Sequence, residues 1–461
     1  MTGWITKKTD FKEHRWDFGY HAFQQMDFYA KWEKIYPSSP LGELISDDSY
    51  GILTPGTVYS PDHPITFLRA TDMRSHLEPN LLDTLRVPQE YYRHQRARLR
   101  KNDILLAIKG ASIASDKSVC FIDFEPVNTI VNGTIFRFQV LPPNNPFYIA
   151  VMLESEILKG QVRNLQIPNN AVAYVDKPSI HALRIPLPPP DVQDRIARIM
   201  QTAYETRKQK LAEITNVIKD IDGFVFAELG INVDKIVRPK ASLKHISDIV
   251  GGRFDFEAVM ANINLEFNGI TSTPLNTVVK KVTEHILPPE ECPEDDVNYI
   301  GLGYIESNTG EIVDFAPVKG NEVLSSSTKF SKGDILFGRM RPYLNKVWIA
   351  EFDGICTGEA IVLRPDFEKV DTAFLHALLM SRLTLNQIIP FQSGTSLPRV
   401  SPSHILEVKL PIPEDLNVQK KISAEIIQRR NKAKQLKFDI EQIIISSKKQ
   451  VEKIILGEAI E

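Results

Sequence analysis

The sequence lacks any apolar run near the about 20 residues that a membrane-spanning helix needs. Residues 1–16 contain no apolar core of the kind found in signal peptides, so we expect neither a leader nor a membrane anchor. Cysteine is scarce, and Cys120, Cys292 and Cys356 are far apart and odd in number. This pattern excludes a disulfide framework and a cysteine-based zinc site, and it favours a cytoplasmic protein with inert thiols.

The sequence also lacks a strong charge of either sign. Its 55 basic residues nearly balance 58 acidic ones, which leaves a formal net charge of −3. A balanced total argues weakly against nucleic-acid binding, but local basic patches can still supply it. Motifs for common chemistry are missing too: there is no Walker lysine, no His-Glu-x-x-His and no Gly-x-Ser-x-Gly.

What the sequence does contain is an internal repeat. The chain has 461 residues, enough for two to four domains. Four landmarks of the first half recur in order in the second: Arg15–Phe18 as Arg253–Phe256, Leu99–Leu105 as Phe330–Leu336, Asn132–Phe136 as Thr357–Ile361, and Asn145–Ile149 as Asp371–Leu375. The second landmark pairs a Lys-Asn-Asp or Lys-Gly-Asp turn with an apolar strand. We therefore expect two copies of one domain.

Each half closes on a Pro-rich segment and a long helix. Residues 185–199 read IPLPPPDVQDRIARI, and residues 410–422 read LPIPEDLNVQKKI. Apolar residues then recur at steps of three and four, which predicts a helix with one narrow seam. The predicted seam residues are Ile196, Met200, Ala203, Leu211, Ile214, Val217, Ile218 and Ile221 in the first helix, and Ile422, Ile426, Ala433, Leu436, Ile440, Ile443, Val451 and Ile454 in the second.

These patterns predict an α+β protein in which two tandem mixed β/α domains are joined by two long helices forming an antiparallel coiled coil. The expected boundaries are 1–185 for the first domain, 186–230 for the first helix, 231–409 for the second domain and 410–461 for the second helix. The helices could instead dock only on their own domains. Their seams are longer than an average helix of roughly 12 residues, however, which favours a rod of roughly 45 Å.

One segment looks catalytic. Asn145-Pro146-Phe147-Tyr148 resembles the Asn-Pro-Pro-Tyr motif with which adenine-N6 methyltransferases hold a flipped adenine. The repeat argues against this role, because the matching segment begins Asp371-Thr372 and contains no proline. Asn or Asp followed by a helix reads equally well as an N-cap, with Pro146 at the first helical position. Without a glycine-rich nucleotide loop, we expect the chain to be non-catalytic.

Basic and polar stretches with interleaved aromatic residues remain. They precede or follow the repeated turn and strand in both halves, which favours DNA contact over an ordinary charged surface. Arginine and asparagine can read base edges, while lysine, serine, threonine and tyrosine bind phosphates. The candidate DNA-binding residues are Arg93, Arg96, Lys109 and Ser112 in the first half, and Arg339, Arg341, Tyr343, Asn345, Lys346, Ser393, Gly394, Thr395, Ser396 and Arg399 in the second.

The order of these motifs resembles the specificity (S) subunits of type I restriction–modification systems. The resemblance rests on residues 332–339 with Arg341 and Lys346, on Ser393-Gly394-Thr395, and on the Leu-Pro segments followed by Gln193 or Gln419. It covers nearly the whole chain through the repeated order of domain and helix. The second half fits better, because the first has no clear Ser-Gly-Thr equivalent near residues 164–170.

The resemblance implies a non-catalytic subunit that reads a bipartite, asymmetric DNA site with its two domains. It also implies that the helices dock two methyltransferase subunits, and that restriction (motor–nuclease) subunits join the complex. S-adenosylmethionine, ATP and Mg²⁺ are then expected on those partners, with no cofactor and no metal in this chain. The alternatives are an S-like subunit of another phage-defence system, a scaffold that binds no DNA, and an adenine methyltransferase.

Overall fold

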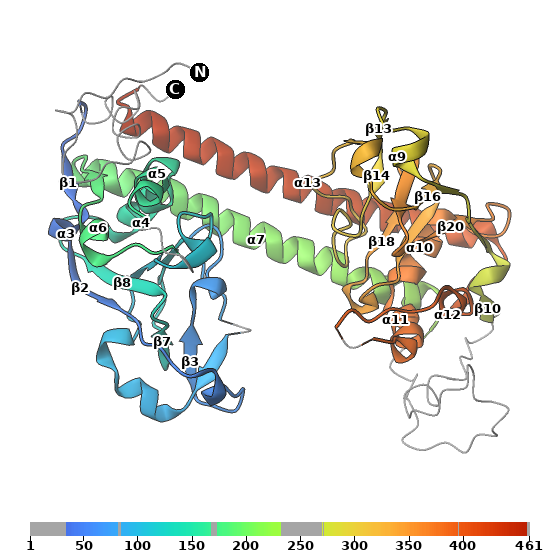
Figure 1. The fold of residues 1–461 in the computed structure, drawn as a ribbon, viewed down its shortest axis with the longest axis horizontal. Helices are drawn as coiled ribbons and strands as arrows, with labels where there is room; N and C mark the ends of the chain where they lie inside the picture. The colour runs from blue at the N-terminus through green and yellow to red at the C-terminus, as the bar shows by residue number, and fades with distance from the viewer. Residues whose placement is uncertain are drawn as a thin grey trace. The chain divides into compact units, whose positions relative to one another are not determined.

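The computed structural model describes residues 34–81, 84–166, 173–231, 270, 272–394 and 396–458 (Figure 1). The repeated motifs at residues 15–18 and 253–256, together with Thr395, lie outside the described residues. The chain separates into two compact units: residues 1–209 with 439–461 form unit 1, and residues 210–438 form unit 2. Among the described residues, no helix is both long and apolar enough to cross a membrane.

Unit 1 combines short strands with short helices (Figure 1). Its strands are β1 (Ser38–Pro40), β2 (Ile45–Tyr50), β3 (Ile65–Leu68), β4 (Leu85–Val87), β5 (Ile104–Ala107), β6 (Val119–Phe121), β7 (Thr129–Val131), β8 (Ile135–Val140) and β9 (Arg184–Pro186). Its helices are α3 (Leu41–Leu44), α4 (Pro146–Glu154), α5 (Glu156–Asn164) and α6 (Lys177–His181), with 3₁₀ turns η2 (Gly56–Val58), η3 (Ala70–Asp72), η4 (Gln89–Arg93), η5 (Gln95–Ala97) and η6 (Gly110–Ser112).

Unit 2 repeats this plan. Its strands are β10 (Ser272–Pro274), β11 (Val279–Lys281), β12 (His285–Ile286), β13 (Asp296–Val297), β14 (Tyr299–Ile300), β15 (Val318–Lys319), β16 (Ser327–Phe330), β17 (Ile335–Gly338), β18 (Val347–Ile349), β19 (Gly354–Thr357), β20 (Ala360–Pro365) and β21 (Lys409–Pro411). Its helices are α9 (Pro288–Glu291), α10 (Thr372–Met380), α11 (Arg382–Ile388) and α12 (Pro402–Leu406), with 3₁₀ turns η10 (Leu275–Thr277), η11 (Gly320–Glu322), η12 (Pro342–Leu344) and η13 (Ile389–Phe391).

The two units share one sheet topology, which confirms the predicted duplication. The main sheet runs β2-β8-β5-β6 in unit 1 and β11-β20-β17-β18 in unit 2, antiparallel throughout. A second sheet pairs β3 with β7 in parallel in unit 1, and β14 with β19 in parallel in unit 2. A further strand pair, β1 with β9 or β10 with β21, precedes each long helix.

The repeated turn before the central strand has a physical cause in both units. Asp103 accepts a hydrogen bond from the backbone N–H of Arg100 at 2.7 Å, and Asp334 accepts one from Ser331 at 2.8 Å. The residue before each aspartate has a positive φ, 67° at Asn102 and 92° at Gly333. Asparagine and glycine tolerate that conformation best, which explains why these residue types recur there.

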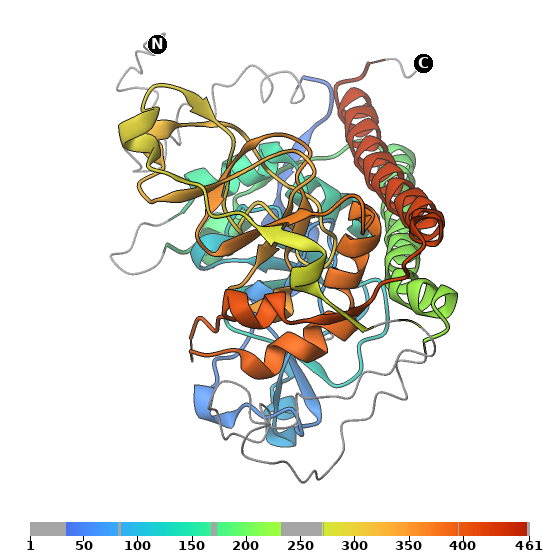
Figure 2. The same cartoon turned by 90° about the vertical axis from the view of Figure 1, so that its right-hand side faces the viewer.

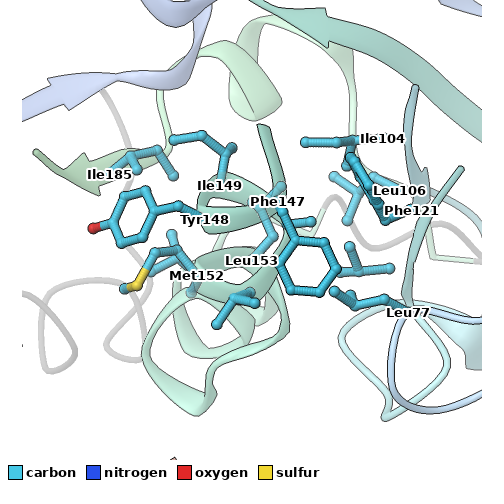
Figure 3. Packing of buried hydrophobic residues seen from close by; sticks show 14 of the residues in the cluster. Leu77, Ile104, Leu106, Phe121, Phe147, Tyr148, Ile149, Met152, Leu153 and Ile185 are labelled. Carbon is cyan, nitrogen blue, oxygen red and sulfur yellow. The ribbon is translucent and has the colours of Figure 1, made fainter. Parts of the chain in front are cut away.

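Each unit buries a helix that is apolar nearly all round against its central sheet. In unit 1, Phe147 of α4 meets Phe121 of β6 edge-on, with ring centroids 5.2 Å apart, and Leu77 lies beside them (Figure 3). In unit 2, α10 occupies the same place, with Phe374 and Leu375 fully buried. Burying a side chain of this size contributes about 2 kcal/mol each, so this helix anchors the fold of its unit.

The helical segments 146–164 and 372–388 are each interrupted by a serine. Ser155 separates α4 from α5, and Ser381 separates α10 from α11. Both serines have extended backbone angles, and each hydroxyl donates to a carbonyl three residues earlier, at 2.6 Å. The hydroxyl thus competes with the helical bonding pattern and turns the chain, a local effect that apolar periodicity does not reveal.

The two long helices are α7 (Pro190–Glu228) and α13 (Leu416–Ile455). In unit 1, Ile196 and Met200 of α7 share one buried cluster with Val451 and Ile454 of α13. In unit 2, residues of the two helices lie side by side and antiparallel, because Lys421 pairs with Glu228 at 3.7 Å and Lys432 with Glu213 at 2.7 Å (Figures 1 and 2). The helices therefore contact each other within both units, as the coiled-coil prediction requires.

Most of the predicted seam is buried. Twelve of its members are at most 9% exposed: Ile196, Met200, Ala203, Ile214, Ile221, Ile422, Ile426, Ala433, Leu436, Ile440, Val451 and Ile454. Val217 and Ile218 are half-buried. Ile443 is half-buried, and its neighbour Ile444 takes the inner place at 8% exposed. Leu211 is 37% exposed and lies off the seam. A drift of this kind is expected where a 3.6-residue helix is read with a seven-residue pattern.

Candidate nucleic-acid interface

The basic stretch after β17 forms a tight loop in unit 2. Arg341 and Asn345 both have left-handed backbone angles, with φ of 49° and 50°, and they flank the 3₁₀ turn η12. Left-handed backbone is costly for residues other than glycine, and arginine is not among the types that adopt it most readily. Such strain is typical of functional loops whose shape is imposed by their surroundings.

A second polar segment closes on this loop. Ser393 and Arg399 exchange two backbone hydrogen bonds of 2.9 and 2.8 Å, which forms a small hairpin around Gly394 with its φ of 96°. The hairpin pairs with the first loop through its backbone. Arg341 N–H donates to the carbonyl of Pro398 at 2.6 Å, and Met340 forms an isolated β-bridge with Arg399. The structure therefore brings together the two stretches that the sequence separates by about 50 residues.

An acidic residue links the two segments. Glu359, which lies in the turn between β19 and β20, accepts two hydrogen bonds from Arg399 at 2.8 and 3.0 Å and lies 3.5 Å from Arg339 Nε. The hydrogen bond from Arg399 holds the pKa of the Glu359 carboxyl below its usual range and raises the pKa of Arg399. Both arginines remain partly exposed, so the loop presents cations held in fixed positions.

The predicted residues of this surface divide into outward and inward sets. Tyr343 is 50% exposed, and Ser393, Gly394 and Ser396 are exposed as well. Asn345 is 7% exposed, and its Nδ2 donates to the carbonyl of Met380 at 2.7 Å. Lys346 is half-buried and donates to the carbonyl of Leu302 at 2.6 Å. In this structure Asn345 and Lys346 hold the loop in place, while Tyr343 and the three hairpin residues face solvent. Arg341 is half-buried and donates from Nη2 to the carbonyl of Ser396 at 3.4 Å.

Unit 1 carries the same backbone frame with different side chains. Gly110 N–H bonds the carbonyl of Ala173 as Arg341 N–H bonds that of Pro398, and Gly110 is also left-handed at 74°. Lys109 forms an isolated antiparallel β-bridge with Tyr174, as Met340 does with Arg399. Four residues after Gly110, Ala114 has the same φ of 50° as Asn345. The loop after β5 is therefore the structural counterpart of the loop after β17.

Charges differ sharply at the matched positions. Ile108 N–H bonds the carbonyl of Thr134 at 3.0 Å, as Arg339 N–H bonds that of Glu359 at 3.0 Å. Because Tyr174 matches Arg399, the ionic cluster of Arg339, Glu359 and Arg399 is replaced by isoleucine, threonine and tyrosine in unit 1. Two frames that agree in backbone and differ in chemistry are suited to reading two unlike targets.

The remaining candidates of unit 1 lie at its surface. Arg93 and Arg96 are exposed on the 3₁₀ turns η4 and η5. Lys109 is exposed, and Ser112 is half-buried at the end of η6. Residues 167–172, which include part of the segment with no clear Ser-Gly-Thr match, lie outside the described residues.

The segment that resembles a methyltransferase motif begins a helix. Asn145 caps α4, because its side-chain oxygen accepts from the N–H groups of Phe147 and Tyr148 at 2.9 and 3.1 Å. Tyr148 is fully buried and donates its hydroxyl proton to the carbonyl of Pro186 at 2.7 Å. Asp371 caps α10 in the same way. The described residues also contain no group of three or more His, Cys, Asp or Glu that is arranged to hold a metal ion.

Sequence reasoning missed two kinds of residue at this surface. Glu359 stands in the repeated segment 357–361, but an isolated acid carries no signal that it will pair with Arg399. His376 and Arg430 are the second kind: His376 is a single charged or aromatic polar residue in the apolar helix α10, and Arg430 is one of several polar residues in a row on α13. A buried histidine in the apolar helix α10 is the one signal that could have pointed to a polar contact there.

Comparison with known proteins gives a consistent result. A family model described as the type I restriction modification DNA specificity domain matches residues 66–216 and 277–450. The type I restriction enzyme EcoDI specificity subunit of Escherichia coli is 25% identical over 268 residues, which are 56% of this chain and 58% of that protein. The MjaVIII specificity subunit of Methanocaldococcus jannaschii is 21% identical over 381 residues, 78% of this chain and 80% of that protein.

Solved structures agree in fold. The crystal structure of a type I restriction–modification S subunit from M. genitalium matches with a TM-score of 0.50 and 14% identity, and the match covers 91% of this chain and 96% of that one. At this identity the likeness concerns the fold alone.

Proposed function

Because the chain belongs to the type I restriction modification DNA specificity family, we propose that it is the DNA-reading subunit of a type I restriction–modification complex. The membership confirms the resemblance read from the sequence, and it assigns the chain to DNA recognition rather than catalysis. In the proposed complex, the chain reads a bipartite, asymmetric DNA site. Methyltransferase subunits dock on it, and restriction subunits join them. S-adenosylmethionine, ATP and Mg²⁺ belong to those partners.

The observation that carries this proposal is the paired loop surface of unit 2. Arg339, Arg341 and Arg399 come from two segments that are hydrogen-bonded into one surface, with Tyr343 and Ser393 exposed beside them. Arginines held by fixed partners favour directional contacts to base edges and phosphates. The matching frame of unit 1 is nearly uncharged, which supports two different half-sites and hence an asymmetric target.

The long helices support the docking part of the proposal. Besides its buried seam, α13 exposes Ile427 and Phe438, 46% and 54% accessible, which lie on one side of the helix opposite the seam. Exposed apolar residues grouped on one helix face are typical of protein–protein contact. We propose this face as a docking surface for a methyltransferase subunit. The domain boundaries 1–185, 186–230, 231–409 and 410–461, and the cytoplasmic location, stay predictions.

The test is to map adenine methylation in cells that contain the methyltransferase partner with and without this chain. We expect methylation at one asymmetric sequence of two separated parts, present only with the chain. A chain with Arg399→Ala is the companion sample. It should lower the base specificity of methylation in only one of the two parts of the DNA sequence. Identical methylation with and without the chain would contradict the proposal and favour a scaffold or another defence role. Binding of S-adenosylmethionine to the isolated chain would instead favour a methyltransferase.

A further inference from the structure

A buried polar contact joins the long helix α13 to the DNA-reading loop of unit 2. Arg430 of α13 donates from Nη1 to Nδ1 of His376 at 2.6 Å and from Nη2 to the sulfur of Met380 at 3.5 Å. His376 is fully buried in α10, and its Nε2 lies 3.0 Å from the carbonyl oxygen of Val347. Since arginine can only donate, His376 accepts at Nδ1 and donates from Nε2–H, so one tautomer satisfies both partners.

Both ends of this contact lie next to the loop. Val347 begins β18, directly after the loop that contains Arg341 and Asn345. Met380 receives the Arg430 contact on its sulfur, while its carbonyl accepts the Nδ2 hydrogen bond of Asn345 at 2.7 Å. Asn345 is one of the two left-handed residues that shape the loop. The helix is thus connected through two α10 residues to the strained end of the reading loop.

Unit 1 has the same device built from different residues. Tyr204 holds the place on α7 that Arg430 holds on α13, eleven residues after Gln193 and Gln419 respectively. Its hydroxyl donates to the carboxylate of Glu154, the last residue of α4 as Met380 is the last of α10. Glu154 in turn accepts from the backbone N–H of His76 at 3.1 Å.

The unit 1 contact ends at another left-handed loop, residues 76–77, which is separate from the loop after β5. His76 and Leu77 have φ of 67° and 64°, and Leu77 lies in the same buried cluster as Ile113 and Ala114, which follow η6. Arg207, one turn beyond Tyr204, adds an ion pair to Glu78 at 3.2 Å. Both units therefore contain a polar contact between the long helix and the first domain helix, although the side chains differ. A contact that served packing alone would not need a polar residue at position 204 and again at position 430, so we infer that the contact has a role.

We propose that Arg430 and Tyr204 are positioning residues for sequence reading: each fixes the loop of its own unit through the end of the first domain helix. This inference rests on the proposed function, since it assumes that the loops read DNA. A loop held at its strained end keeps its arginines within the narrow geometry that base contacts require. Removing the contact of Arg430 or Tyr204 should therefore reduce base specificity more than it reduces the affinity for DNA phosphates.

The experiment compares three variants of the full complex with methyltransferase subunits: Arg430→Met, Tyr204→Phe and, as control, Lys434→Met. The control makes the same new side chain on α13 at a position 52% exposed. Once methylation mapping has identified the target, binding is measured to duplexes carrying one changed base in either half-site. The readout is the affinity for the target divided by the affinity for the changed duplex. This ratio does not depend on the fraction of active protein.

The half-site read by unit 2 is the one at which Arg341→Gly lowers the affinity ratio. We expect Arg430→Met to lower the ratio at least about fivefold for that half-site and to leave the ratio for the other half-site unchanged. Tyr204→Phe should lower the ratio for the half-site read by unit 1 and leave the ratio for the half-site read by unit 2 unchanged. Lys434→Met should leave both ratios unchanged. Unchanged ratios, or equal losses at both half-sites, would overturn the inference. Should Arg430→Met not fold, Tyr204→Phe and Arg430→Lys decide it by the same criterion. A wild-type complex without any base discrimination would instead refute the proposed function.

Discussion

The side-chain oxygen of Gln419 accepts a hydrogen bond from the backbone N–H of Asp371 at 2.8 Å. The same glutamine donates to the carbonyls of Lys369 and Pro413 at 3.0 and 2.7 Å, and it is fully buried. Gln193 bonds Asn145 in the same way at 3.0 Å in unit 1. In each unit the first turn of the long helix is therefore joined to the N-cap of the buried domain helix.

We predict that Gln419→Leu lowers the free energy of unfolding of the chain by about 3 kcal/mol. The leucine fits the space but leaves the N–H of Asp371 and the carbonyls of Lys369 and Pro413 without this partner, and each buried group left unpaired costs about 1–3 kcal/mol. The shift in the urea midpoint measures the effect. Lys420→Leu, at an exposed neighbouring position, is the control and should change stability by less than about 0.5 kcal/mol.

Arg341→Gly should weaken DNA binding by the complex without disturbing the loop. Glycine accepts the left-handed backbone of this residue, and unit 1 has Gly110 at the matching place. Only the cationic side chain is lost, so the affinity should fall about tenfold or more at moderate salt. If Arg341 contacts a phosphate, the slope of log affinity against log salt should also fall by about one.

Lys369→Ala is the control for Arg341→Gly. Lys369 is exposed near the start of the long helix α13, where its backbone carbonyl accepts from Gln419, and its loss should leave DNA affinity within about twofold. An Arg341→Gly complex that binds its target as tightly as the wild type would remove this residue from the reading surface.

Glu359→Gln should act in the opposite direction. Glu359 now neutralises part of the charge of Arg339 and Arg399. Removing its charge frees both guanidinium groups, so affinity for unrelated duplexes should rise while the preference for the target falls. Filter binding with target and random DNA measures both. If Glu359 served only to stabilise the hairpin, Glu359→Gln would instead weaken binding to both duplexes equally.

The fold was predictable where the signal is local and repeated. The Lys-Asn-Asp and Lys-Gly-Asp turns, the N-caps Asn145 and Asp371 and the helix seams each follow from short-range chemistry, and the structure confirms the duplication and the helix contact. Element boundaries were harder to predict. Ser155 and Ser381 each end a helix through one side-chain hydrogen bond, and nothing in apolar spacing distinguishes such a serine from one that points to solvent.

The candidate site was predictable in outline only. Basic residues after equivalent strands pointed to the two loops whose backbone frames match, because a cation that follows a buried strand must lie at its end. Which of them face outward depends on contacts from distant segments: Asn345 turns inward because the carbonyl of Met380 is there to receive it. Glu359 pairs with Arg399, which is 40 residues away in the sequence, and Arg430 pairs with His376, which is 54 residues away. No sequence pattern encodes partners at such separations.

Acid should destabilise unit 2 through His376. Its burial, and the positive charge of Arg430 beside it, hold the pKa of His376 well below 6.5 in the folded chain. In the unfolded chain His376 takes up a proton near pH 6.5, so the unfolded state binds more protons below that pH. The free energy of unfolding should therefore rise with pH up to about 6.5, by up to about 1.4 kcal/mol per pH unit from this residue, and then level off.

His376→Gln tests this, because glutamine can donate to Val347 and accept from Arg430 without titrating. Urea unfolding at pH values from 5 to 8 should show a smaller slope below pH 6.5 for the variant than for the wild type. Equal slopes for the two proteins would mean that other groups account for the acid sensitivity of unit 2.

Ile440→Asp should weaken assembly with the methyltransferase partner. Ile440 is 9% exposed on the seam of α13, and a carboxylate there must either stay buried without a partner or push the two long helices apart. Either outcome costs several kcal/mol and disturbs the surface on which partners are proposed to dock. Gln442→Asp places the same side chain at an exposed position two residues away and should leave assembly unchanged. Sedimentation of the mixed subunits distinguishes the two variants, and a full-strength complex with Ile440→Asp would show that docking does not depend on the paired helices.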